Sequence, residues 1–276
     1  MVSVIEDIFA YDFLVNAFVA CLLSGVTCGI VGSYVVARRM VFLSGGVTHA
    51  SFGGLGIALY YGANPVVGAL IFAVISSMGI EFASRRGGIR EDSAIGIVWS
   101  AGMALGALFM AMRPGYATDL TSYLFGNILL VSFEDNIYLA LLAVAVVVGA
   151  FALLRRLMYV TFDEEYARSQ GVAVGVAGYV MSAIVAVTIV FSIKVMGIVL
   201  LMSLITIPAV IAGALTKDFR YIALWASIIA VISNVTGFII SYTYDLPTGS
   251  CVIFMLIGAL IVVKLLTLPR RKGVVA

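Results

Sequence analysis

The stretch that decides the fold of this chain is Val41–Tyr61, VFLSGGVTHASFGGLGIALYY. It is apolar and matches the roughly 20 residues that a helix needs to cross a bilayer. It carries the single histidine of the chain, His49, among glycines at positions 45, 46, 53, 54 and 56. Positions four apart share one face of a helix, so Gly45, His49 and Gly53 line up. Stripes of small residues allow close helix packing in a membrane, which predicts a tightly packed membrane helix here.

The composition of the whole chain indicates the same environment. The 276 residues are 63% hydrophobic and 11% charged, with a mean hydropathy of +1.18. Soluble domains carry about 25% charged residues. We therefore predict an all-α, polytopic membrane helix bundle, a single transmembrane domain over residues 1–276 with no separate soluble domain.

Apolar segments of helical length recur along the chain. The gap at Ser192–Lys194 fits either a break in one long element or a tight hairpin, so we expect eight or nine spans. The nine candidate spans are about residues 13–36, 42–61, 65–83, 94–112, 137–155, 174–191, 195–214, 220–242 and 249–267.

The basic residues gather on one side if these spans alternate in direction. That side holds Arg38, Arg39, Arg85, Arg86, Arg90, Arg155, Arg156, Arg168, Lys217, Arg220, Lys264, Arg270, Arg271 and Lys272, and the other holds Arg113 and Lys194. Basic residues favour the cytoplasmic side. We expect a multi-pass protein of the plasma (inner) membrane with its N-terminus outside and its C-terminus in the cytoplasm.

The predicted outer side is acidic, with Asp119, Glu134, Asp135 and Asp245. These charges are either ordinary solvated loop residues or a means of attracting cations to the mouth of a pathway. The apolar segment Leu120–Ser132 is too short to cross alone, and we interpret it as a re-entrant element at the outer surface.

His49 is the first candidate for a functional residue, because ionisable side chains at membrane depth are usually functional. The alternative is a histidine that bonds a neighbouring helix. One histidine makes a poor metal site, but a symmetric dimer would present two to one axis. The small-residue stripes, including Gly46, Ala50, Gly54 and Ala58, favour contact with a second copy. Weak ligation suits transport, since the ion must also leave.

Other chemistry is absent from the sequence. It contains no phosphate-binding loop, no histidine pair and no cysteine cluster. An intramembrane hydrolase using Ser44 or Ser51 with His49 would lack a second acid or base on the same helix. We expect a chain that is not an enzyme, holds no permanent cofactor and binds no nucleic acid.

The loop MYVTFDEEYARSQGVAVG is the most polar segment on the predicted inner side. Residues 162–170 predict a short amphipathic helix that Gly171 closes as a C-cap. Acidic residues at its start and an arginine near its end suit the helix dipole. The helix is either a docking element or an ordinary solvated loop helix. The candidate contact residues are Phe162, Asp163, Glu164, Glu165, Tyr166 and Arg168.

Six segments occur in the order seen in one known family: GGVTHASFGGLGIAL, IREDSAIGIVWSAGMALG, DLTSYLFGNILLVS, FDEEYARSQGV, KVMGIVLLMSLITIPAVIA and DLPTG. Over about residues 13–267 the chain resembles the membrane permease subunit of zinc/manganese/iron ABC importers (ABC-3 type). The resemblance implies a type II importer-like homodimer that moves a divalent metal by alternating access. It also implies an ATP-binding subunit in the cytoplasm, docked on a coupling helix at about residues 162–171, and an extracytoplasmic metal-binding protein.

The chain departs from that family at one position. Members usually carry an aspartate four residues before the histidine, and here that residue is Gly45. A site that keeps an imidazole but loses a hard oxygen ligand favours manganese less and zinc or iron more. Ser44, Thr48, Ser51, Glu81 or Asp92 are the candidates to supply an oxygen instead.

Three alternatives remain at this point. A siderophore or cobalamin permease would need a wide pathway and no mid-helix histidine. A stand-alone secondary transporter would need intramembrane acidic residues, and apart from Glu81 near a helix end the spans carry almost none. A structural or signalling membrane protein is the third.

Overall fold

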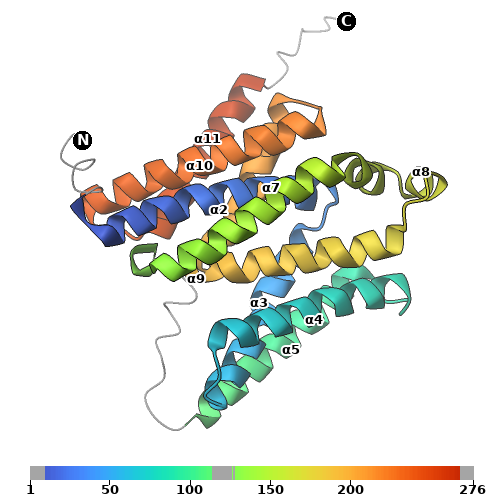
Figure 1. The fold of residues 1–276 in the computed structure, drawn as a ribbon, viewed down its shortest axis with the longest axis horizontal. Coiled ribbons are helices and arrows are strands. Elements are labelled where there is room, and N and C mark those ends of the chain that lie inside the picture. Colours follow the sequence, from blue (N-terminus) through green and yellow to red (C-terminus); the bar gives the residue numbers. More distant parts are fainter. Residues whose placement is uncertain (1–9, 114–125, 127, 268–276) are drawn as a thin grey trace, which may run out of the picture.

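The computed structural model describes residues 10–113, 126 and 128–267, and within those ranges every regular element is a helix (Figure 1). The elements in chain order are α2 (Asp12–Ala37), α3 (Val41–Tyr60), α4 (Pro65–Arg85), α5 (Glu91–Met112), the 3-10 turn η1 (Ile128–Leu130), α7 (Phe133–Phe162), α8 (Glu164–Ser169), α9 (Val174–Leu215), α10 (Phe219–Tyr244) and α11 (Thr248–Thr267). Most of the predicted re-entrant element at Leu120–Ser132 lies outside the described residues.

In the described part of the chain, eight helices are long and apolar enough to cross a membrane: α2, α3, α4, α5, α7, α9, α10 and α11. This confirms the predicted membrane bundle of eight or nine spans. As one straight helix, the 42 residues of α9 would be about 63 Å long at 1.5 Å per residue, about twice the thickness of a bilayer core. Its length calls for a bend.

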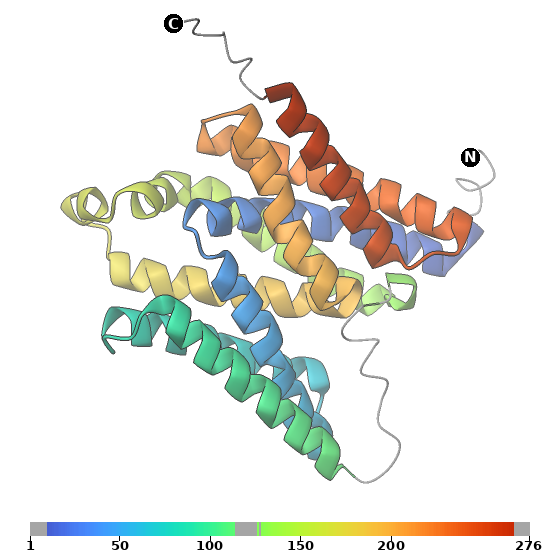
Figure 2. The same cartoon turned by 180° about the vertical axis from the view of Figure 1, so that it is seen from behind.

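The bend in α9 lies at Gly197, where φ is 74° and ψ is 168°. This conformation is open almost only to glycine. Figure 2 shows the first leg of α9, residues 174–196, running in yellow to the bend, where the orange second leg, residues 198–215, turns back. Gly126 contacts the bend so closely that a side chain there would clash with the Gly197 backbone. The predicted break at Ser192–Lys194 therefore falls a few residues later, inside one element.

α3 lies between α4 and α5 and is buried along most of its length. Its glycines are the reason the helices approach closely. A Cβ atom at Gly53 would press on the backbone of Gly102 in α5, and one at Gly54 would clash with Gly68 in α4. The expectation that these glycines face a second copy is wrong, because they pack against helices of the same chain.

The two ends of the bundle carry the charges that the alternating spans predict. At one end Glu164 forms ion pairs with Arg38 and Arg85, and Figure 1 shows α8 at that end. At the other end the Lys194 ammonium lies 2.6 Å from the Asp135 carboxylate. Residues predicted for opposite sides of the membrane thus lie at opposite ends of the bundle.

Candidate functional site

His49 is the one partly exposed residue in the buried stretch of α3 from Leu43 to Gly56. Every residue from Leu43 to Gly56 is buried in the chain except His49, which is half-buried. A polar side chain in an apolar bundle normally turns inward to find a partner. Here the imidazole instead reaches the surface that the single chain leaves open.

The ring of His49 is held by an aromatic stack rather than by a hydrogen bond to Nδ1. Trp99 of α5 lies parallel to it, with ring centroids 4.3 Å apart and planes 6° from parallel. The Nδ1 atom of His49 is buried and has no hydrogen-bond partner among the described residues. An oriented ring with an unpaired nitrogen favours a ligand role over a purely structural hydrogen bond.

The space beside Gly45 is filled from another helix. A Cβ atom built on Gly45 would lie 3.0 Å from Cε and 3.6 Å from Sδ of Met202, in the second leg of α9. The hydroxyl oxygen of Ser44 lies 3.9 Å from this sulfur. Met202 is half-buried, so its side chain also reaches the surface of the single chain.

The oxygens suggested from the sequence have other partners. Ser44 donates to Val41 O at 2.7 Å, Thr48 donates to Ser44 O at 2.6 Å, and Ser51 donates to Thr48 O at 2.6 Å. The Glu81 carboxylate is bound by Arg85 in α4 and accepts a hydrogen bond from Ser182 in α9. Asp92 lies exposed in the first turn of α5, 3.9 Å from Arg90.

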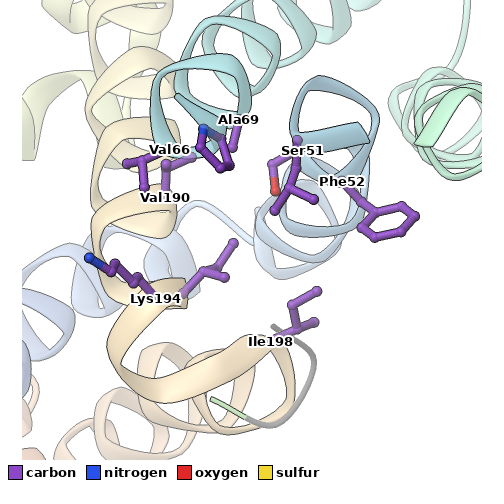
Figure 3. Close-up of a pocket in the computed structure, with 10 residues that line it drawn as sticks. Ser51, Phe52, Val66, Ala69, Val190, Lys194 and Ile198 are labelled. Carbon is purple, nitrogen blue, oxygen red and sulfur yellow. The ribbon is translucent and has the colours of Figure 1, made fainter. Parts of the chain in front are cut away.

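Three cavities in the described structure do not include His49. The smallest, about 30 Å³, lies between α3, α4 and α9, and Figure 3 shows Ser51 pointing into it and the Lys194 amine turned away. It has room for about one water. An apolar cavity of about 680 Å³ separates α7 from α9, and one of about 830 Å³ lies beside the α10–α11 turn near Asp245. None of these three cavities is lined by His49.

Figure 2 shows α3 between α5 and the second leg of α9, so these two helices flank α3. Both flanks expose apolar side chains, among them Ile97 at 61% and Val199 at 48%. In a membrane such a face contacts either lipid or another apolar protein surface.

The short helix at the charged end is α8, Glu164–Ser169. Asp163 is its N-cap and accepts a hydrogen bond from the Tyr166 backbone N–H at 2.9 Å. Gly171 follows the helix with φ of 76°, as expected of a glycine that ends a helix. The predicted start at Phe162 is wrong, because Phe162 is the last residue of α7.

Glu164 connects α8 to two other helix ends. Its Oε1 lies 2.9 Å from Arg38 Nη2 and 3.3 Å from Arg85 Nη2, and its Oε2 lies 4.0 Å from Arg168. Burial alone would raise the pKa of Glu164, but the hydrogen bonds from Arg38 and Arg85 outweigh it and lower this pKa. The carboxylate of Glu164 thus forms its contacts within the chain.

Other residues of this segment remain available to a partner. Phe162 is 63% exposed and Tyr166 is 46% exposed, while Glu165 and Arg168 are also exposed. Phe162 lies edge-on to Phe219 at 5.9 Å between ring centroids. Aromatic side chains beside charged ones are typical of a protein-binding surface.

The fold and the site together define a class: a multi-pass helical membrane protein with an ionisable ring at its open face, as transport proteins have. The chain belongs to the ABC 3 transport family, whose model matches residues 10–268. This confirms the resemblance drawn from the sequence.

Two relatives and one solved structure illustrate the similarity. The chain is 31% identical to the "Manganese transport system membrane protein MntC" of Halalkalibacterium halodurans, over 91% of this chain and 86% of that protein. It is also 31% identical to a "Probable metal transport system membrane protein" of Chlamydia trachomatis, over 94% of this chain and 90% of the other. A chain of "PsaBC from Streptococcus pneumoniae in complex with Fab" shares the fold with a TM-score of 0.86 at 24% identity, covering 96% of this chain and 95% of that one.

Proposed function

We propose that this metal-transport permease serves an ATP-driven importer that carries a divalent transition metal, zinc, manganese or iron, into the cytoplasm. Two copies face each other, and His49 of each lines the pathway between them. The observation that carries the proposal is the half-buried imidazole in an otherwise buried stretch of α3, with Nδ1 unpaired among the described residues. The relatives named as manganese and metal transport proteins support it.

Alternating access follows from this arrangement. The His49 ring supplies a weak ligand, so the ion is held long enough to be selected and is then released. Two chains whose α3 helices open and close around a shared axis would expose the ring first to one side of the membrane and then to the other. Because the glycines of α3 pack closely against α4 and α5, these three helices move together as one body.

The partners belong to opposite ends of the bundle. An ATP-binding subunit docks in the cytoplasm on the exposed side chains of Phe162, Glu165, Tyr166 and Arg168. An extracytoplasmic metal-binding protein delivers the ion at the end that carries Asp135 and Asp245. The N-terminus lies outside and the C-terminus in the cytoplasm of the plasma membrane, which the distribution of basic residues supports.

The test is metal uptake by cells whose own copy of this chain is replaced by His49→Ala. Uptake of zinc, manganese and iron should all fall to background, while the variant still inserts in the membrane and co-purifies with its partners. Ser100→Ala is the matched control, because Ser100 is an exposed residue of α5 whose hydroxyl bonds only Gly96 O of its own helix. Normal uptake by His49→Ala refutes the proposal.

A further inference from the structure

The side chain that fills the space beside Gly45 is a methionine. Met202 reaches from the second leg of α9 to within van der Waals distance of the position that a Gly45 Cβ would take. We propose that the Met202 thioether is a second donor of the metal pathway and makes the pathway favour zinc over manganese. This inference rests on the proposed function of His49.

The imidazole of His49 and the sulfur of Met202 both lie on the side of α3 that carries Gly45 and His49. Gly45 and His49 are one turn apart, about 6 Å along the helix axis. Side chains on a helix lean toward its N-terminus, so the His49 side chain leans toward Gly45. Trp99 covers one face of the ring from α5, and Met202 approaches the strip from α9.

The sulfur is positioned without being locked. Its contact with the Ser44 hydroxyl, over 3.9 Å, is weak, because sulfur is a weak acceptor and that hydroxyl donates to Val41 O at 2.7 Å. Methionine has three rotatable side-chain bonds and adapts its shape to its surroundings. Met202 is half-buried, and a change of rotamer is the movement by which its sulfur would turn toward a cation at His49.

The donor set decides which metal is preferred. Thioether sulfur is a soft ligand, and imidazole suits zinc, whereas carboxylate and water oxygens suit manganese. Gly45 offers no carboxylate, and the nearby Ser44, Thr48 and Ser51 hydroxyls bond backbone carbonyls of their own helix. A pathway lined by His49 and Met202 therefore discriminates against manganese.

Met202 also fills space, so the test must remove the sulfur and keep the volume. Met202→Leu does this, because Leu and Met are close in size and both apolar. Met78→Leu is the matched control, since Met78 lines the apolar cavity beside α7. Zinc and manganese uptake are measured side by side in cells that carry the complete transport system.

We expect Met202→Leu to lower the ratio of zinc to manganese uptake by roughly tenfold, a loss typical of metal sites, with Met78→Leu unchanged. Gly45→Asp should lower the same ratio by adding a hard ligand, and the atoms nearest to its Cβ belong to the flexible end of Met202. An unchanged ratio in Met202→Leu overturns the inference.

A second readout is X-ray absorption at the zinc edge on the purified, zinc-loaded chain. The spectrum should show a sulfur neighbour in the native chain and in Met78→Leu, and lose it in Met202→Leu. A sulfur signal that persists in Met202→Leu, or is absent from the native chain, counts against the inference. The proposed function has a separate test, because it is refuted only if His49→Ala retains metal uptake.

Discussion

The imidazole of His49 and the indole of Trp99 lie face to face, with ring centroids 4.3 Å apart and planes 6° from parallel. They come from α3 and α5, which the glycines of α3 bring into contact. A tryptophan face also stabilises positive charge. The stack thus orients the imidazole and is compatible with a ring that binds a cation.

Replacing Trp99 tests this orienting role. Trp99→Leu removes an aromatic stack worth about 0.5–1.5 kcal/mol, so the apparent affinity for metal in uptake should fall about two- to tenfold. Trp99→Phe keeps a ring and should retain most of the affinity. Equal uptake curves for the native chain and Trp99→Leu would show that the stack only fills space.

Glu164 should stabilise the charged end of the bundle. Glu164→Gln removes the charge that pairs with Arg38 and Arg85, and we expect a loss of about 1 kcal/mol, the upper end for a partly exposed pair. Thermal unfolding of the detergent-purified chain measures it. Glu165→Gln is the control, because Glu165 is exposed. This variant should have the same melting temperature as the native chain. Equal melting of the two variants would contradict the role of Glu164.

The same ion pairs predict a pH dependence. The folded pKa of Glu164 is lowered from its ordinary value of 4.5, so its stabilisation is fully present above pH 4.5 and is lost as pH falls through the folded pKa. The stability difference between the native chain and Glu164→Gln should be constant near neutral pH and shrink only in acid. A difference that grows on acidification would reverse the sign and refute the assignment.

The bend of α9 depends on glycine. Gly197→Ala forces a β-carbon into a conformation that costs about 1–3 kcal/mol for other residues, and the melting temperature should drop. Gly213→Ala serves as the control, since a Cβ there meets no atom within 4 Å and alanine gains about 0.5–1 kcal/mol over glycine in a helix. Equal effects of the two changes would contradict the bend.

The exposed aromatic residues near α8 should govern docking. Tyr166→Ala removes a side chain that is 46% exposed, and recovery of the ATP-binding subunit with the purified permease should fall. Ser169→Ala, which removes a hydroxyl bonded only to Tyr166 O, should leave recovery unchanged. Undiminished recovery with Tyr166→Ala would place the docking surface elsewhere.

Much of the fold could be predicted from the sequence because apolar length and basic flanks depend on the bilayer alone. Arg38 and Lys194 were assigned to opposite sides on that basis, and they lie at opposite ends of the bundle. The sequence predicted a break or a tight hairpin at Ser192–Lys194. Lys194 forms an ion pair with Asp135, and the bend itself lies at Gly197.

The candidate site could be predicted only in part. A lone histidine among glycines is visible in the sequence, but the glycine pattern does not say which helix approaches, and α4 and α5 proved to be the partners. Trp99 and Met202 carry no signal in their own segments, since each meets α3 only through tertiary packing. Glu164 was predicted to face a partner, and its arginine partners lie 126 and 79 residues away in the sequence.

The most direct test of the central claim is the accessibility of position 49. His49→Cys keeps a metal-binding side chain, and the native Cys21, Cys28 and Cys251 are buried, so a charged, water-soluble thiol reagent should label the new cysteine alone. The account predicts labelling in the assembled transporter and protection by zinc. Labelling only by a lipid-soluble reagent, with no protection by zinc, would place this residue against lipid and contradict a pathway at His49.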